Sequence, residues 1–218
     1  MADLTTYAGL KDAIADYLGR GDMTERIPTF IKLAEMRLNR ELRMRVMERR
    51  ATTDIVGGQK MVPLPWKRVA GDWDVFMEMR DLSFLPTGGS GGKIVNLVYM
   101  PPDRAQLESS VSGCPAQYTI LGRELLLIPC PDGAGTLTMA YYAEIPPLSD
   151  EQVTNDVLLT APDVYLYASL VESGSFTRGS APVAEWAQYL EAAKENIRKQ
   201  ENRARYTANI TMRPTRRI

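Results

Sequence analysis

The apolar residues near the N-terminus recur at the spacing of an α-helix. In residues 4–18 they share one helical face, as Leu4, Tyr7, Leu10, Ile14 and Leu18. Gly19 and Gly21 then break this helix, and Pro28 suits the first turn of a second helix that extends to about Arg45. The pattern therefore predicts two helices in the N-terminal part of the sequence.

The pattern then changes to short apolar runs separated by glycine and proline. The clearest stretch predicts three strands, at residues 117–121, 124–129 and 136–143. A tight turn at residues 121–123 and a loop at residues 130–135 join these strands, which predicts an antiparallel meander.

Helical spacing returns in the C-terminal part of the sequence. Thr160 can cap a helix, and Pro162 can lie in its first turn. Ser180 and Pro182 then mark the start of a long final helix. The apolar stripe of that helix repeats at spacings of 4, 3 and 4, as Trp186, Leu190, Ala193 and Ile197.

The predicted elements follow in the order of two helices, a β-rich insertion and two more helices. We expect an α+β fold in which the four helices pack as one bundle and the β region projects from it. The predicted domains are a helical bundle of residues 1–48 and 157–205, an inserted antiparallel β domain at 49–156, and an extended C-terminal docking arm at 206–218.

Charge is distributed unevenly along the chain. Residues 203–218, RARYTANITMRPTRRI, hold five arginines and no acidic residue. The other residues hold 21 Lys and Arg against 27 Asp and Glu, a net charge of −6, although the whole chain carries only −1. A general DNA-binding face needs basic charge across the folded domain, so this division favours a basic arm that binds an acidic or polar partner.

The sequence contains no histidine, which excludes several catalytic and metal sites. Ser-His-Asp and Cys-His arrangements require it, and a structural zinc site needs about four Cys or His ligands. We expect Cys114 and Cys130 to be free, partly buried thiols. The glycine-rich residues 87–92 lack the spacing of a phosphate loop and predict a turn. We therefore expect no catalysis, no metal and no cofactor, and no apolar run is long enough to span a membrane.

A cluster of acids leaves a second interpretation open. It consists of Asp72, Asp74, Glu78 and Asp81. A metal-dependent nuclease could use such a group. The acids alternate with apolar residues, however, which favours the exposed face of an extended segment.

Aromatic and arginine-rich segments allow two interpretations as well. The tyrosines Tyr141, Tyr142, Tyr165 and Tyr167 could stack on bases. Their apolar neighbours instead favour packing in the core or between subunits. The arginine-rich residues 37–50 could contact DNA, whereas the simpler interpretation is a solvated helix surface or a subunit contact.

Several motifs occur in an order that resembles a known family. They are IPTFIKLAEMRLNRELRMR, MVPLPWKR, GCPAQYTILGRELLLIPCPD, LTMAYYAEIPPLSDEQVTNDVLLTAPDVYLYASLVES and WAQYLEAA. Together they resemble the head-to-tail adaptor proteins of tailed bacteriophages, a group that includes tail tubular protein A of short-tailed phages. The resemblance covers roughly residues 5–200. It departs from the family at Trp66-Lys67, where an acidic residue often follows the proline, and in the longer glycine-rich loop.

The resemblance implies a structural virion protein at the head–tail interface, made in the host cytoplasm. Such adaptors assemble as a ring, typically dodecameric, beneath the phage portal protein. They contact a downstream tail or nozzle protein, and genomic DNA passes through their channel without sequence-specific binding. An acidic body suits such a conduit, because a basic wall would bind many phosphates tightly.

In this family the C-terminal segment docks on the portal. The resemblance and the basic charge together predict the portal-docking residues Arg203, Arg205, Tyr206, Ile210, Met212, Arg213, Arg216, Arg217 and Ile218. Arg203 and Arg205 are expected to belong to the end of the last helix. The alternative function is a DNA-binding accessory protein that uses the arginine-rich helix and the tail.

Overall fold

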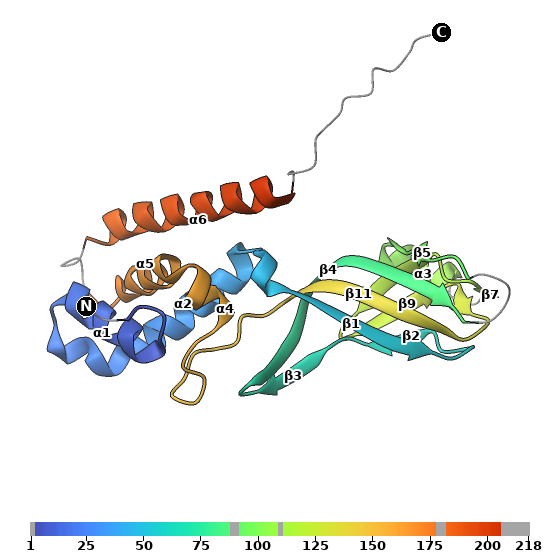
Figure 1. Cartoon of the computed structure of the whole chain (residues 1–218), viewed down its shortest axis with the longest axis horizontal. Helices are drawn as coiled ribbons and strands as arrows, with labels where there is room; N and C mark the ends of the chain where they lie inside the picture. The colour runs from blue at the N-terminus through green and yellow to red at the C-terminus, as the bar shows by residue number, and fades with distance from the viewer. Residues whose placement is uncertain (1–2, 88–91, 109–110, 178–181, 206–218) are drawn as a thin grey trace, which may run out of the picture. The chain divides into compact units, whose positions relative to one another are not determined.

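The computed structural model describes residues 3–87, 92–108, 111–177 and 182–205. Two compact units make up the chain (Figure 1). Residues 1–47 and 145–218 belong to the helical unit, and residues 48–144 belong to the β unit. Residues 145–156, which the hydrophobic pattern groups with the β insertion, therefore lie in the helical unit.

The helical unit is assembled from segments on both sides of the β unit. Its N-terminal elements are α1 (Tyr7–Leu18), the 3₁₀ turn η1 (Gly21–Arg26), α2 (Ile27–Glu41) and the 3₁₀ turn η2 (Arg45–Met47). Its C-terminal elements are α4 (Asp156–Thr160), α5 (Pro162–Ser173) and α6 (Val183–Arg205).

Local sequence accounts for the ends of these helices. Thr6 caps α1, because its hydroxyl accepts a hydrogen bond from the Gly9 backbone N–H at 3.2 Å. Gly19 ends α1 with a positive φ of 59°, which a residue without a Cβ adopts at little cost. Pro162 occupies the first turn of α5, as predicted. Thr160 does not cap α5. It is the last residue of α4, and its hydroxyl donates to the carbonyl of Asp156.

The predicted four-helix bundle is wrong, although the fold is α+β. In a four-helix bundle each helix buries one stripe. Here α5 packs against α1, α2 and α6, and Figure 1 shows it between α2 and α6. Most of its circumference is buried, through Val164, Tyr165, Leu166, Ala168, Ser169, Leu170 and Ser173. A helix that is apolar nearly all round becomes a central element around which the others are arranged.

The described residues of the β unit form two main sheets and one short strand pair. The first sheet has the order β1 (Glu48–Ile55), β11 (Gly135–Ala143), β4 (Asp72–Pro86), β3 (Trp66–Val69), with β5 (Val95–Asn96) also paired to β4. The second has the order β2 (Met61–Pro63), β9 (Glu124–Ile128), β8 (Gln117–Leu121), β6 (Val98–Tyr99). The short pair is β10 (Cys130–Pro131) with β7 (Ser112–Gly113), and α3 spans Pro102–Glu108.

The predicted strands of the 117–143 region are confirmed, but the meander is wrong. β8 and β9 pair antiparallel around a turn in which Gly122 has a φ of 65°. β11 instead joins the other sheet, between β1 and β4. Pro129 and Pro131 follow β9 and lack the N–H donor that a ladder requires, so the chain leaves this sheet. Two pairings, β6 with β8 and β10 with β7, are parallel, so the unit is not purely antiparallel.

The two main sheets share one apolar core. Its buried residues come from strands of both sheets and from their connections, as Ile55, Val62, Leu64, Leu82, Phe84, Leu97, Tyr118, Leu125, Leu127, Leu137, Met139, Tyr141 and Ala143. Leu125 and Leu137 are fully buried and belong to different sheets. The side chains of both sheets are therefore packed against one another in the interior of the unit.

Candidate functional site

Helix α6 directly precedes the C-terminal segment. Apolar contacts and ion pairs attach this helix to the rest of the helical unit. Trp186, Leu190 and Ala193 are buried, which confirms the predicted stripe, and Ile197 is half-buried. The Lys194 ammonium is also buried, and it lies 2.6 Å from a Glu41 carboxylate oxygen and close to Glu191. Burial lowers the pKa of Lys194, but the hydrogen bonds to the two glutamates outweigh it, so its pKa is raised.

A second ion pair fixes the end of α6. The Arg45 guanidinium lies 3.2 Å from the Glu201 carboxylate, which also accepts the Arg45 backbone N–H. Arg203 is exposed one half-turn further on, and the helix ends at Arg205, as predicted. The other predicted docking residues, from Tyr206 to Ile218, lie outside the described residues.

The arginine-rich segment 37–50 is largely engaged with the protein itself. Arg37 pairs with Glu172 at 2.7 Å, and Arg80 of β4 pairs with Glu48. The Arg40 side chain donates to the Met36 carbonyl, and the Arg43 side chain donates to the carbonyls of Asn39 and Leu42. These contacts favour the interpretation as a structural surface over that of a DNA-binding face.

The acidic cluster lies along a single strand, β4, where Asp72, Glu78 and Asp81 are exposed. Asp74 accepts a hydrogen bond from the Tyr141 hydroxyl at both carboxylate oxygens, at 2.9 and 2.8 Å. Asp72 pairs with Lys67 at 3.1 Å. Within the described part of the chain, no three Asp, Glu or Cys side chains converge as metal ligands would.

The candidate stacking tyrosines are mostly core residues, as the packing interpretation predicted. Tyr141, Tyr142 and Tyr165 are buried. Burial and the Asp74 hydrogen bond raise the pKa of Tyr141. Tyr167 is half-buried and packs against Tyr189 of α6, with ring centroids 5.3 Å apart.

The two cysteines are free, as predicted. Cys130 is half-buried, also as predicted, but the prediction of partial burial is wrong for Cys114, which is exposed. The glycine-rich residues 88–91 lie outside the described residues. Among the described helices, none is long and apolar enough to cross a membrane.

A buried polar network joins α2, α5 and the segment before α4. The Glu35 carboxylate accepts the Leu148 backbone N–H at 2.7 Å and lies 3.5 Å from the Tyr165 hydroxyl. The Asn155 amide donates to that hydroxyl at 2.7 Å and to the Pro146 carbonyl at 2.8 Å. Burial raises the pKa of Glu35 to about 7, although the hydrogen bonds from Leu148 and Tyr165 act in the opposite direction.

The residues of this network come from four separate sequence motifs. Glu35 belongs to the LAE motif, Leu148 to PPLSD, Asn155 to TN and Tyr165 to PDVYLY. Asn155 also caps α4, because its side-chain oxygen accepts the Leu158 backbone N–H at 2.8 Å. Sequence reasoning found the motifs but not their convergence, since no local pattern reports on contacts across 113 positions.

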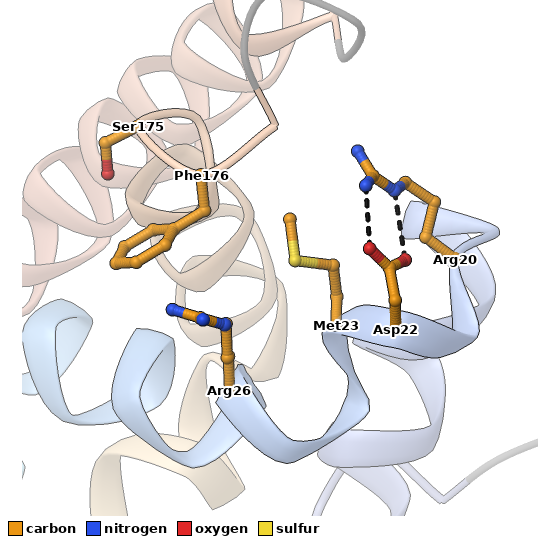
Figure 2. Close-up of a pocket in the computed structure, with 6 residues that line it drawn as sticks. All are labelled: Arg20, Asp22, Met23, Arg26, Ser175 and Phe176. Carbon is orange, nitrogen blue, oxygen red and sulfur yellow. Dashed lines mark hydrogen bonds and ion pairs between the residues drawn. The ribbon is translucent and has the colours of Figure 1, made fainter.

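A cavity of about 450 Å³ lies between η1 and the residues that follow α5 (Figure 2). It is lined by Arg20, Asp22, Met23, Arg26, Ser175 and Phe176. Arg20 and Asp22 form an ion pair at 2.7 Å, and the Arg26 guanidinium lies over the Phe176 ring. Both cations are thus engaged with neighbouring side chains of the same unit.

Sequence reasoning missed two surfaces that carry aromatic residues. On the helical unit, Tyr17 of α1, Tyr167 of α5 and Tyr189 of α6 lie together. On the β unit, Trp66 of β3 is 40% exposed, and the guanidiniums of Arg68 and Arg123 lie over its ring. Tyr17 follows Leu10 and Ile14 at helical spacing, so the sequence pattern places it with the apolar stripe and gave no sign that it is 53% exposed.

The described residues thus offer charged and aromatic surfaces for contacts with other proteins. The buried polar network of Glu35, Asn155 and Tyr165 stabilises the helical unit that carries the tyrosines. A family model described as SU10 adaptor protein matches residues 5–216, nearly the whole chain. The chain therefore belongs to this family of phage head-to-tail adaptors. No curated protein matches it.

Membership of the family confirms the resemblance seen in the motifs. It makes the chain a structural, non-enzymatic component of the virion. As a phage adaptor, the protein associates with other head and tail proteins.

Proposed function

We propose that the protein is a ring-forming head-to-tail adaptor, dodecameric and placed beneath the portal. In this function it connects the portal of the capsid to a downstream tail or nozzle protein. Its ring lines the channel through which genomic DNA leaves, without sequence-specific binding. Residues 206–218, together with Arg203 and Arg205, dock on the portal.

The observation that carries this proposal is the attachment of α6. The helix is held by buried apolar contacts, by Lys194 with Glu41, and by Arg45 with Glu201. The arginine-rich residues that follow therefore begin at a fixed position on an acidic body. A basic segment presented in this way suits an acidic groove on a partner, because guanidinium groups pair bidentately with carboxylates.

The charge of the rest of the chain supports the role of a conduit. Without residues 203–218 the chain has 21 basic and 27 acidic residues, a net charge of −6. Such a wall repels phosphates and keeps the friction on passing DNA low. The contact of Arg37 agrees with this, since its charge is paired with the Glu172 carboxylate.

The test uses the portal protein of the same phage. We expect a variant that lacks residues 206–218 to keep the unfolding midpoint of the full chain but to lose binding to purified portal rings. Alanine in place of Arg213, Arg216 and Arg217 should weaken binding strongly. The control replaces Arg198 and Lys199, exposed cations of α6 before the arm, and should bind normally. Normal joining of the truncated chain to portal rings would show that the arm has another role.

A mobility-shift titration separates this function from a DNA-binding accessory role. The purified chain should not bind duplex DNA at low salt. Salt-dependent binding that disappears with Arg213, Arg216 and Arg217 would instead support the accessory role.

A further inference from the structure

Three tyrosines from three helices form one exposed surface on the helical unit, which we call the tyrosine face. Tyr17 is 53% and Tyr189 is 45% exposed. Tyr167 lies between them, hydrogen-bonded to Tyr17 and in ring contact with Tyr189 at 5.3 Å. Tyrosine loses little conformational entropy on binding and is enriched at the energetic centres of interfaces.

Carboxylates make this surface acidic. The Tyr189 hydroxyl donates to Glu185 at 2.6 Å. Asp163 is exposed one turn before Tyr167 on α5. Burial raises the pKa of Tyr167, and Tyr17 and then the charge of Asp163 raise it further. Within the described residues, no basic side chain forms an ion pair with Asp163 or Glu185. The tyrosine face therefore suits a cationic partner with an apolar centre.

The outer side of α2 has the complementary character, and we call it the methionine stripe. It consists of Lys32, Met36 and Arg40, which lie at i, i+4 and i+8 and are exposed. Met36, at the centre, is 52% exposed. The opposite side of α2 is buried through Phe30, Ile31, Ala34 and Leu38. A basic stripe with an apolar, adaptable centre thus points away from the unit's own core.

The two surfaces occupy different sides of the same rigid unit. α5 packs against α2 and also against α6, which carries Tyr189 (Figure 1). A contact between two different faces of identical chains is heterologous, and each copy then presents a free face to the next copy. Contacts of this kind generate rings when the rotation between copies closes.

We propose that the tyrosine face of one copy binds the methionine stripe of a neighbouring copy. This inference rests on the proposed ring and names the surfaces that would build it. Met36 packs among Tyr17, Tyr167 and Tyr189, while Lys32 and Arg40 pair with Asp163 and Glu185 at the rim. The apolar centre supplies most of the affinity, and the rim charges set the register between copies.

Cysteine cross-linking on portal-bound assemblies tests the contact. In a chain with Cys114 and Cys130 changed to serine, Met36→Cys and Tyr189→Cys are introduced in separate chains. Mixed with portal rings and a short bis-maleimide, the two chains should give a cross-linked dimer, and each chain alone should give none. A chain with both changes should give a ladder of oligomers. The control pair, Met36→Cys with Val56→Cys, joins two accessible positions, 52% and 63% exposed, and should not cross-link because Val56 is not part of the tyrosine face.

A charge exchange tests the same contact without cysteines. Asp163→Lys with Glu185→Lys should reduce the number of copies per portal ring, counted by electron microscopy. The double variant Lys32→Glu, Arg40→Glu, without the other two changes, should also reduce the number of copies per portal ring. Combining all four changes restores opposite charges across the contact and should restore the copy number. Circular dichroism and unfolding midpoints confirm that each variant folds.

The outcomes separate this inference from the proposed function. The proposed contact would be overturned if the Asp163→Lys, Glu185→Lys chain formed complete rings and no Met36–Tyr189 cross-link formed. The proposal that the protein forms a ring would not be affected by that result. An unmodified chain that forms no rings on the portal would overturn the proposed function itself. Failure of the four-change variant to recover would show that the two surfaces do not face each other.

Discussion

The Glu35 carboxylate accepts a hydrogen bond from the Leu148 backbone N–H at 2.7 Å, across 113 positions of sequence. The contact attaches the chain that leaves the β unit to α2 and helps close the helical unit. Because the carboxylate is buried, its pKa is raised from 4.5 to about 7. The stability of the unit should therefore depend on pH near neutrality.

The first prediction concerns Glu35→Gln. Between pH 4.5 and about 7 the folded chain holds a proton on Glu35 that the unfolded chain has released, so stability falls as pH rises through this range. This group should contribute roughly 3 kcal/mol less stability at pH 8 than at pH 4.5. The amide in Glu35→Gln has no such titration, so the variant should lose less stability over this range. Urea unfolding at several pH values measures the difference.

The matched control for this prediction is Glu25→Gln, which removes an exposed carboxylate of η1. It should unfold with the pH dependence of the original chain. Parallel pH profiles for Glu35→Gln and the original chain would contradict the assignment of the titration to Glu35.

The second prediction concerns the buried ammonium of Lys194. Replacing both partners, as Glu41→Gln with Glu191→Gln, leaves this cation buried without a carboxylate and should destabilise the chain by about 2–4 kcal/mol. Lys194→Met removes the charge itself and should cost less, since the side chains of Glu41 and Glu191 are 37% and 63% exposed and remain hydrated. Guanidinium unfolding measures the two losses in stability. A larger loss for Lys194→Met than for the double glutamine variant would refute this account. Glu195→Gln, which removes an exposed pair, should change stability by less than about 0.5 kcal/mol.

The third prediction distinguishes a stabilising role of Asp74 from a catalytic role in DNA cleavage. Tyr141→Phe removes the hydroxyl that donates to Asp74 and should lower the stability of the chain by about 1–2 kcal/mol. Asp74→Ala should destabilise by a similar amount, because it leaves the buried hydroxyl without its acceptor. Neither the original chain nor these variants should cleave DNA with Mg²⁺. Cleavage that Asp74→Ala abolishes would restore the nuclease interpretation.

The fourth prediction concerns Asn155, whose side chain caps α4 and also bonds Pro146 and Tyr165. Asn155→Ala should cost about 2 kcal/mol or more, since it removes a helix cap and leaves a buried hydroxyl without a donor. Asn155→Asp keeps the cap but loses both amide donors. Its loss of stability therefore measures the contribution of the hydrogen bonds to Pro146 and Tyr165 alone. Differential scanning calorimetry measures both variants. Equal stability of Asn155→Ala and the original chain would show that the contacts of Asn155 do not stabilise the fold.

Local patterns predicted the elements well because the governing interactions are short in range. The stripe of Trp186, Leu190 and Ala193 is buried, and Pro162 begins α5. β8 and β9 lie where alternation and the turn at Gly122 place them. Each of these depends on residues a few positions apart.

The arrangement of the elements could not be obtained in this way. Periodicity shows that α5 is apolar but not that it packs against α1, α2, α4 and α6. β11 reads as the third strand of a meander, yet it pairs with β1 and β4, far away in sequence. The tyrosine face draws one residue from each of three helices, so no single segment contains its pattern.

The central place of α5 also has a consequence for synthesis on the ribosome. α1 and α2 emerge first, but α5, against which they pack, follows only after residues 48–144. The β unit can therefore be complete while apolar side chains such as Leu10 and Phe30 still lack their cover. The helical unit is the last part of the nascent chain to close, and slow translation beyond residue 144 should lengthen the period in which chaperones bind it.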